Sequence, residues 1–536
     1  MQAHPPTVVI VPVVLPRDGT LPSVTSHPDP RLVPVVIASG QCLERTDTLN
    51  PVELMARAAN EALQMAPALR NKIERLSVVN IMTKVGPAPA TELARELGIT
   101  DVACEVSTIG GNTPQWLVNR AASEIAAGQL SVTMIAGAEA IRSSRARRAE
   151  GGDRYLGETA LPADPMVGDN LPGSTPAEDA VFLLAPIHVY PLFETALAAR
   201  NGRSSAQQRQ FIGELMAPFT KVAARHPVAW FPEVLTPEEI ANPSPANRLV
   251  CDPYTKRMTA FLGSDQAAAV IVCSLAAARE AGVADQAVFI WAGAETTDVR
   301  SVTARADLSR SPALHAGGSA LCSAAGQAAG RPFGMDDLDR IEIYSCFPSA
   351  VQQAAEAFGL PTNDPRGLTV TGGLPYFGGP GNNYTSHGIA TLTDLLRQDG
   401  SNDGEPRFGL ATGLGWYITK HALGLYGTTP PPGGFQRADT TEVQKSLDAE
   451  AQEVALSVAE EQPATVLSAT VVRDHEGGAG GAPVIVRLED GRHMTLTPAN
   501  DGVTAAMGAM GAMDVVDLVG RPVVVSANEP RYRLAE

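Results

Sequence analysis

The sequence lacks any cysteine pattern that would hold a metal ion or a disulfide framework. Its six cysteines are scattered singly, with no CxxC pair and no Cys/His pair at metal-ligand spacing; they are Cys42, Cys104, Cys251, Cys273, Cys322 and Cys346. Isolated thiols of this kind are typical of reduced cytosolic proteins, in which most of them are small core residues. We therefore expect a cytoplasmic protein with no metal site and no bound cofactor.

Long apolar runs and an excess of positive charge are also missing. The apolar stretch TVVIVPVVL at residues 7–15 is too short to span a bilayer, and it lacks the basic start and the cleavage site of a signal peptide. The formal net charge of −17 argues against a general nucleic-acid surface. The sequence thus predicts neither a membrane span nor a nucleic-acid partner.

What the chain does have is length and a globular composition. Its 536 residues are 44% hydrophobic and 18% charged, which is typical of two or three folded domains. Apolar strands alternate with helices over residues 32–137 and again over 260–415, which predicts a mainly parallel α/β sheet in two similar halves. In the first half, Asn50, Pro51 and Glu53 form the capping-box pattern that begins a helix.

Two regions depart from this alternation. Residues 140–245 are charged, rich in proline and partly helical, which predicts an inserted loop domain at the edge of the sheet where α/β folds place ligand sites. The run TTPPPGG at residues 428–434 predicts a linker, and a helix is expected after it at residues 441–459. Short alternating strands over residues 464–527 predict a small all-β barrel of the OB type.

A strand, a glycine turn and a helix at residues 102–127 organise the first half. In α/β enzymes such an elbow often presents a nucleophile against a helix N-terminus, where the free N–H groups favour an anion. The apex of this elbow is Thr108, and the helix is expected to begin near Thr113. A threonine is a weak nucleophile without a nearby base. Thr108 is therefore either a nucleophile or a simple turn residue.

A basic cluster stands out in this acidic chain. It lies in the sequence RSSRARRAEGG and comprises Arg142, Arg145, Arg147 and Arg148. Charge runs usually form a solvated helix face, but clustered arginines also bind phosphorylated ligands. Both interpretations stay open, and Arg145 and Arg148 are the ligand-binding candidates.

Several stretches carry a likeness to a known family. They are RLVPVVIASGQ with NPVELMARAANEAL, VSTIGGNTPQWLVNRAASEIAAG with MIAGAEAI, the long segment NRLVCDPYTKRMTAFLGSDQAAAVIV, and finally IEIYSCFPSA, GGLPYFGGPGNN and LATGLG in that order. Together they resemble the thiolase superfamily, nominally the acetyl-CoA acetyltransferase family, and within it the sterol-carrier-protein-type and thiolase-like branches. The resemblance covers residues 30–427 and does not reach the predicted β module.

This resemblance implies a duplicated thiolase fold in αβαβα layers, with an inserted loop domain and a C-terminal OB-like β-barrel module. The expected divisions are a mobile tail at 1–30, an N-terminal half at 31–139 and 246–259, a loop domain at 140–245, a C-terminal half at 260–427, a linker and helix at 428–462, and the β-barrel at 463–536.

The resemblance also implies which residues should carry chemistry, and here the chain departs from the family. Thiolases use a cysteine at the elbow, a histidine in a GHP loop, a second cysteine in a C-x-x-G loop, and an Asn or His in an NEAF or HDCF motif. The corresponding residues in this chain are Thr108, Gly379, Leu410 and Tyr344. Loss of a nucleophile or its base costs about three to six orders of magnitude in rate, so standard acyl transfer is predicted to be absent.

Ligand binding can survive the loss of that chemistry. The resemblance implies an acyl-CoA ligand whose pantetheine runs beside the elbow, where Gly110, Gly111 and Asn112 could offer N–H groups to a thioester carbonyl. His387 is a further ligand-binding candidate, although a residue at a helix start also serves as a cap or packs in the core.

Three functions therefore stay open. The first is a thiolase-like protein that binds acyl-CoA or a related lipid thioester without transferring the acyl group. The second is a carbon–carbon lyase or synthase that uses Tyr344, and tentatively Tyr384, as the steroid side-chain retro-aldolases of this fold use tyrosines. The third is a non-catalytic carrier or assembly protein whose β module recruits a partner protein. Thiolases are usually dimers, and a fused module could cover that surface, so both a monomer and a homodimer are considered.

Overall fold

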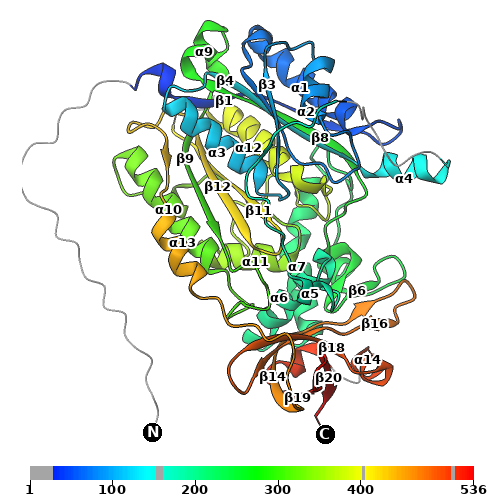
Figure 1. Cartoon of the computed structure of the whole chain (residues 1–536). Coiled ribbons are helices and arrows are strands. Elements are labelled where there is room, and N and C mark those ends of the chain that lie inside the picture. The colour runs from blue at the N-terminus through cyan, green and yellow to red at the C-terminus, as the bar shows by residue number, and fades with distance from the viewer. Residues whose placement is uncertain (1–27, 152–160, 401–404, 509–513, 536) are drawn as a thin grey trace, which may run out of the picture.

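The structure is a computed structural model that describes residues 28–151, 161–400, 405–508 and 514–535. It consists of a large α/β body and a small β-barrel at one end (Figure 1). Almost all of the predicted tail at residues 1–30 lies outside the described residues, so its mobility stays a prediction.

One large mixed sheet runs through the α/β body. Its strands follow the order β10 (Arg340–Glu342), β11 (Phe408–Gly415), β12 (Lys420–Gly427), β9 (Val288–Thr297), β1 (Pro34–Leu43), β8 (Asp265–Ser274), β4 (Val132–Ala140), β2 (Arg75–Val78), β3 (Ala103–Ser107) and β5 (Met166–Val167), and β13 (Gln436–Arg437) pairs with β9. Within the described part of the sheet, the two halves β1–β8–β4–β2–β3–β5 and β10–β11–β12–β9 pair with each other through a short antiparallel contact between β1 and β9.

The prediction of a mainly parallel sheet was wrong. Strand β8 runs antiparallel to both of its neighbours, β1 and β4, and β12 runs antiparallel to β9 and β11. Within the described strands of this large sheet, parallel pairing is found between β2 and its neighbours, β3 and β5, β10 and β11, and β13 and β9. A continuous apolar strand indicates burial on both faces, but its direction depends on where the preceding connection re-enters the sheet, which residue pattern alone does not reveal.

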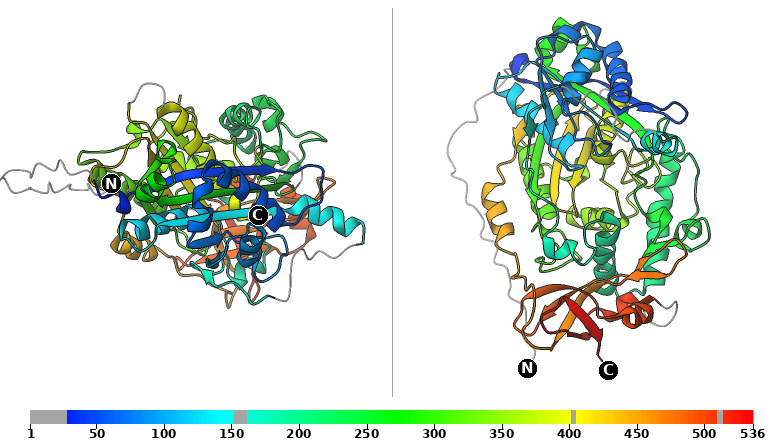
Figure 2. Two further views of the ribbon diagram at one scale, coloured as in Figure 1. Left: turned by 90° about the horizontal axis from the view of Figure 1, so that it is seen from above. Right: turned by 45° about the vertical axis from the view of Figure 1, so that its right-hand side comes forward.

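The helices give the body its layers. They are α1 (Pro51–Met65), α2 (Pro89–Glu96), α3 (Thr113–Ala126), α4 (Ile141–Ala149), α5 (Pro176–Asp179), α6 (Pro186–Arg200), α7 (Ser205–Ala223), α8 (Pro237–Ala241), α9 (Leu275–Glu280), α10 (Pro312–Ala329), α11 (Pro348–Ala357), α12 (Tyr384–Gly400), α13 (Thr441–Asp448) and α14 (Asp501–Gly508). Helices α3 and α12 contact each other and strands of both halves, so they form a central layer. Helices α1 and α2 cover the first half, and α10 covers the second, which completes the expected αβαβα order (Figures 1 and 2).

The local signals at the first helix are confirmed. The side chain of Asn50 accepts hydrogen bonds from the N–H groups of Val52 and Glu53, while the Glu53 carboxylate accepts from the Asn50 N–H. This reciprocal pairing satisfies backbone donors that an α-helix leaves without partners. Helix α1 then buries its alanine- and leucine-rich face against β1, β4 and β8.

A closed five-stranded barrel follows the α/β body, as predicted. Its strands are β14 (Gln462–Ala469), β17 (Val484–Leu488), β18 (His493–Pro498), β20 (Arg531–Leu534) and β19 (Pro522–Val525), and each pairs with the next around the ring. The helix expected at residues 441–459 is shorter, because α13 ends at Asp448. The barrel has its own apolar core, which includes Val466, Val486 and Tyr532.

The barrel lies at one end of the α/β body (Figure 2), where it contacts helix α6 and the small sheet that contains β6. The Ser468 hydroxyl donates a 2.6 Å hydrogen bond to the carbonyl of Leu192 in α6, and Arg473 forms a 2.5 Å ion pair with Asp252. A small second sheet strengthens this junction, in the order β16 (Ala479–Gly481), β15 (Val472–Arg473), β6 (Leu249–Cys251) and β7 (Tyr254–Thr255). The C-terminal hairpin β15–β16 thus extends a strand pair of the α/β body.

The cysteine and membrane expectations can be compared with the described part of the chain. All six cysteines are free. Among the residues that the structure describes, none of the helices has both the length and the apolar composition needed to cross a bilayer.

Candidate functional site

The predicted elbow is present between β3 and α3. Strand β3 ends at Ser107, whose hydroxyl accepts from the N–H of Asn80 and donates to Thr113 Oγ1 at 3.1 Å. The chain turns at Gly110, which has a φ of +149°, a value that favours glycine. Thr113 then begins α3, and its N–H donates to the Gly110 carbonyl. Short-range polar contacts therefore set the turn.

Thr108 lies at the apex, but it faces the short strand β5. Its N–H donates to the carbonyl of Val167, and a methyl group placed on Gly168 would lie 2.8 Å from the Thr108 hydroxyl oxygen. The side chain is 2% exposed. Thr108 is therefore buried against β5 at the apex of the elbow.

The three elbow residues proposed to bind a thioester differ in which hydrogen-bonding groups are free. The Gly110 N–H already donates a 3.0 Å hydrogen bond to Asn382 Oδ1. Gly111 is crowded, since a methyl group there would lie 2.2 Å from the Tyr344 hydroxyl oxygen and 2.6 Å from the Leu414 carbonyl oxygen. Asn112 is buried, and among the described residues nothing donates to its Oδ1. The elbow thus keeps one unsatisfied acceptor.

Tyr344 lies directly over the elbow glycine. Its side chain is 7% exposed, and within the described ranges no hydrogen-bond partner reaches its hydroxyl. Burial, followed by the neighbouring Cys346, raises the pKa of Tyr344 well above its ordinary value. A phenol of this kind stays protonated and acts as a hydrogen-bond donor to developing negative charge, and it is a poor general base.

Tyr384 adjoins Tyr344 but points its hydroxyl elsewhere. The two rings meet edge to face with centroids 5.4 Å apart. The Tyr384 hydroxyl donates to Glu342 Oε1 at 2.6 Å and lies 2.6 Å from the Thr371 hydroxyl. It is therefore held in a buried network, and its ring positions Tyr344.

The structure does not bring Leu410 to the elbow. Its side chain lines a small space beneath α10 with Leu321, Cys322 and Leu425. On the same strand, Gly413 faces the elbow, because a methyl group there would lie 2.8 Å from the Cα of Asn112. The strand alternates the directions of its side chains, so an alignment shifted by an odd number of residues selects the opposite face.

Gly379 and His387 have contacts other than Tyr344. The Gly379 N–H donates to the Phe261 carbonyl at 2.8 Å, which places the loop beside Phe261 and Leu262. His387 is fully buried in α12, where its Nδ1 lies 2.8 Å from Gln41 Oε1. Burial lowers its pKa to about 3, so it stays neutral and packs in the core.

A larger cavity lies beside the segment that carries Tyr344, and we name it the basic pocket. Its volume is about 640 Å³. Apolar side chains such as Phe231, Phe261 and Tyr376 line it, while its cationic residues are Arg145, Arg248, Lys256 and Arg257, joined by His475 of the C-terminal hairpin. The Ala260 N–H, at the pocket wall, donates to the Cys346 carbonyl two residues after Tyr344.

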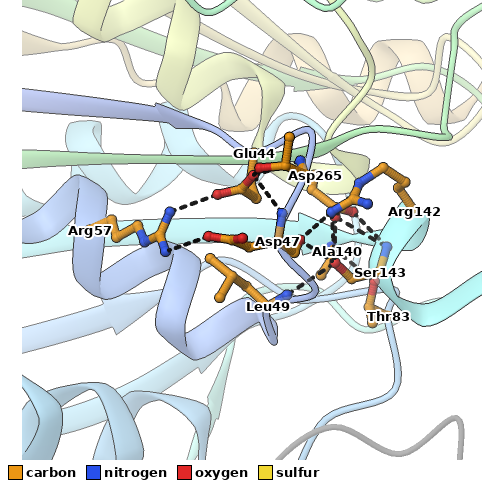
Figure 3. Close-up of polar contacts among 10 residues, drawn as sticks. Glu44, Asp47, Leu49, Arg57, Thr83, Ala140, Arg142, Ser143 and Asp265 are labelled. Atoms are coloured by element: carbon orange, nitrogen blue, oxygen red, sulfur yellow. Dashed lines mark hydrogen bonds and ion pairs between the residues drawn. The ribbon is translucent and has the colours of Figure 1, made fainter. Parts of the chain in front are cut away.

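The arginines of α4 have different roles: one forms a structural ion pair, and another lines the basic pocket. Arg142 is a structural residue, because it pairs with buried Asp265 at 3.1 Å and donates to the Asp47 carbonyl (Figure 3). Arg145 lines the basic pocket, whereas Arg148 is exposed and is not among the residues that line it. Of the two predicted ligand contacts, only Arg145 is placed to make one.

Sequence reasoning missed Lys420. It begins β12 and is only 5% exposed, with its Nζ donating to the Ile109 carbonyl at 2.7 Å and to the Asp169 carbonyl at 3.2 Å. Burial lowers the pKa of Lys420 to about 8. The Asp169 carboxylate opposes this shift, and the Arg300 guanidinium adds to it. The available signal was a charged pair, Lys420-His421, at the start of an otherwise apolar strand, because buried lysines are rare unless they serve a purpose.

Comparison with known proteins identifies the class of protein to which this fold and site belong. The chain resembles the crystal structure of a monomeric SCP2-thiolase like protein type 1 from Mycobacterium smegmatis, with 29% sequence identity, a TM-score of 0.78, and coverage of 95% of this chain and 100% of that one. It also shares its fold with the Ltp2-ChsH2(DUF35) aldolase, at 18% identity and a TM-score of 0.56, over 73% of this chain and 97% of that one. No family model and no curated protein sequence matches the chain.

The chain therefore belongs to the thiolase-like superfamily, and it has the α/β thiolase-like fold with a mixed sheet and a C-terminal five-stranded β-barrel. The likeness to the SCP2-thiolase like protein extends over the barrel as well as the α/β body, since it covers 95% of the chain.

Proposed function

We propose that this protein binds a CoA thioester or a related lipid thioester in the basic pocket and lacks cysteine-dependent acyl transfer. The observation that carries the proposal is the composition of the pocket, whose lining combines apolar side chains with four cationic residues and one carboxylate, Glu233. Arginine and lysine bind phosphate groups, and an apolar lining suits an acyl or pantetheine chain. The volume of about 640 Å³ also falls within the range of small-molecule sites.

The reacting end of such a ligand is expected to approach Tyr344. The pocket wall at Ala260 is hydrogen bonded to the Tyr344-bearing segment, and the Tyr344 hydroxyl has a free donor position over Gly111. A protonated phenol supports binding of a thioester carbonyl. Among the described residues, Thr108, Gly413 and Tyr344 face the elbow, and none of the three carries a thiol, which supports the absence of a covalent acyl-enzyme.

Calorimetric titration with octanoyl-CoA tests this proposal. Arg145→Glu and Lys256→Glu are each expected to weaken binding at least about tenfold, a loss of about 1.4 kcal/mol for replacing an attraction by a repulsion. Arg148→Glu is the matched control, because it changes the same charge on the same helix outside the pocket. Binding should also weaken as salt is added. No measurable affinity, or an equal loss in Arg148→Glu, would contradict the proposal.

A carbon–carbon lyase is the second candidate function, and the free Tyr344 hydroxyl is the observation that favours it. Its raised pKa suits donation to the enolate that leaves in a retro-aldol cleavage of a β-hydroxyacyl thioester. If such cleavage is detected, Tyr344→Phe should reduce kcat by about a hundredfold or more. Cleavage at full rate in this variant would exclude the tyrosine mechanism.

A non-catalytic carrier or assembly protein is the third candidate. The position of His475 at the basic pocket supports a part for the C-terminal module in ligand binding. Replacement of His475 by alanine in the full chain separates the two ideas. Weaker octanoyl-CoA binding is expected if the hairpin contributes to the pocket. Unchanged binding would favour the alternative, in which the module recruits a partner protein.

A further inference from the structure

A second, smaller cavity lies at the elbow itself, and none of the residues that line it lines the basic pocket. This elbow cavity has a volume of about 150 Å³, and its wall includes Thr108, Asn112, Trp116, Asp169, Thr297 and Lys420. A space of this size holds a molecule about as large as benzene. It therefore suits a compound of a few carbon atoms, and not a whole thioester.

Lys420 presents a single nitrogen atom at this cavity in a defined orientation. Its Nζ donates to the carbonyls of Ile109 and Asp169, at 2.7 Å and 3.2 Å, and lies close to the turn at Gly110. A neutral amine has two N–H groups and one lone pair. When both N–H groups are directed at carbonyl oxygens, the lone pair is left for another partner, which is the arrangement that a nucleophilic amine requires.

The charges around Lys420 allow the neutral amine to form near neutral pH. The titratable groups at the cavity are Asp169, Glu295 and His421, and Arg300 also acts on Lys420. Both carboxylates already have cationic partners, because Asp169 pairs with Arg300 and Glu295 pairs with Arg437. Desolvation consequently dominates and lowers the pKa of Lys420 to about 8.

Asn112 supplies an independent sign of a missing ligand. The residue is 8% exposed and lines the cavity, and its Oδ1 has no donor among the described residues. A methyl group placed on Gly110 would lie 2.3 Å from this oxygen and 3.3 Å from the Lys420 Nζ, so both atoms border the same glycine. A buried acceptor without a donor is costly, which indicates that an O–H or N–H group belongs there.

We propose that Lys420 is a carbonyl-binding amine, which condenses with a small aldehyde or ketone in the elbow cavity to form an imine. The lone pair of Nζ forms a bond to the carbonyl carbon, the C=O π pair moves to the oxygen, and one N–H proton transfers to that oxygen to give a carbinolamine. The hydroxyl of this carbinolamine donates to Asn112 Oδ1. The hydroxyl then leaves with the one remaining N–H proton as water while the nitrogen lone pair forms the C=N bond, so one water is released for each imine formed and nothing is oxidised or reduced.

This activity assigns a nucleophile to an elbow that holds no cysteine. A protonated imine withdraws electrons from the neighbouring carbon, as lysine-dependent enzymes exploit when they break carbon–carbon bonds or remove protons. The substrate class is therefore a short aldehyde or ketone. The inference does not rest on thioester binding, because the basic pocket and the elbow cavity have different walls.

Reductive trapping of the wild-type protein tests the proposal. The protein is incubated with propanal and cyanoborohydride at pH 8, and the labelled lysines are identified and timed by peptide mass spectrometry. Lys420 is expected to be labelled at least about tenfold faster than exposed Lys221 on α7, because about half of its side chains are neutral at pH 8 against about 1% or less for an ordinary lysine. Labelling of Lys420 no faster than Lys221 would overturn the proposal.

Two controls make the result specific to the cavity. Naphthaldehyde exceeds the space available, so it should label Lys221 and leave Lys420 unlabelled; equal labelling of both would show that the cavity does not select the carbonyl compound. Asn112→Ala removes the acceptor but keeps the amine, and it should slow propanal labelling of Lys420 several-fold while that of Lys221 stays constant. An unchanged rate at Lys420 would contradict the part assigned to Asn112.

Discussion

Two neighbouring tyrosines at the centre of the molecule have opposite surroundings. The hydroxyl of Tyr384 is bound to Glu342 and Thr371, whereas that of Tyr344 has no partner among the described residues and lies over Gly111. Their rings are only 5.4 Å apart, so distance from the core does not explain the difference. The Tyr384 hydroxyl is thus used to hold a loop, whereas the Tyr344 hydroxyl and the Asn112 Oδ1, which border the elbow glycines, have no partner among the described residues.

Glu342, the partner of Tyr384, holds a loop through five hydrogen bonds. Its Oε2 accepts from the Thr369 hydroxyl and from the N–H groups of Val370 and Thr371, and its Oε1 accepts from the hydroxyls of Thr371 and Tyr384. Burial raises its pKa, and these donors oppose that shift. One side chain therefore fixes the loop at 369–371 against β10 and α12.

Removing this carboxylate should have the largest effect on stability. Glu342→Ala leaves several buried donors unpaired and is expected to lower the free energy of unfolding by about 4 kcal/mol, as measured by urea denaturation. Glu342→Gln is the matched control, since an amide oxygen still accepts from the two backbone N–H groups, and about 1–2 kcal/mol is expected. Equal losses in the two variants would show that packing, and not hydrogen bonding, is what matters at this position.

Glu139 holds a second loop, at residues 82–83, and its titration makes the stability of the protein depend on pH. Its carboxyl accepts from the N–H groups of Met82 and Thr83 and from the Thr83 hydroxyl, and burial raises its pKa to about 7. The folded state then binds a proton more tightly than the unfolded chain between pH 4.5 and 7. The stability that this group contributes is present below pH 4.5 and is lost as the pH rises through 7.

The second prediction follows from that sign. Over the window from pH 4.5 to 7, the wild type should lose about 3 kcal/mol relative to Glu139→Gln, which cannot titrate. Parallel urea titrations of the two proteins at several pH values measure the difference. A difference that is constant with pH would mean that Glu139 keeps an ordinary pKa in the folded protein.

The smallest stability effects are expected for the two tyrosines themselves. They test directly whether the Tyr384 hydroxyl is hydrogen bonded and the Tyr344 hydroxyl is not. Tyr384→Phe should lower the free energy of unfolding by about 1–2 kcal/mol, because Glu342 loses a buried donor. Tyr344→Phe should change it by less than about 0.5 kcal/mol, since no bond is lost. Thermal or urea denaturation of the pair measures both. A larger loss for Tyr344→Phe would reveal a structural bond to that hydroxyl and weaken its assignment to a ligand.

Much of the architecture was predictable because it is coded over short distances. The elbow at Ser107–Thr113 and the capping box at Asn50 are patterns of neighbouring residues. The closed barrel likewise follows from short alternating strands with turn signals between them. The directions of β8 and β12 were not predictable, since apolar strands pair equally well with either polarity.

The candidate site was predictable only in part. In the structure Thr108 lies at the apex of the elbow and Tyr344 borders Gly111, whereas Leu410 lies beneath α10 and Gly413 faces the elbow. A shift of one residue along a strand reverses the direction of the side chain, and a short glycine-rich motif does not fix that register. Arg145 and Arg148 differ by about one helical turn and share a charge, yet only Arg145 reaches the pocket.

By itself, the sequence determined that this chain has a thiolase-like α/β body with a fused β-barrel and an elbow without its cysteine, because each of these depends on residues close together in the chain. Only the tertiary structure decided which polar groups are left free. Lys420 is separated from Ile109 by more than three hundred residues, and Tyr344 from Gly111 by more than two hundred, yet they meet at the elbow. Contacts over such separations depend on how the two sheet halves pack around α3 and α12.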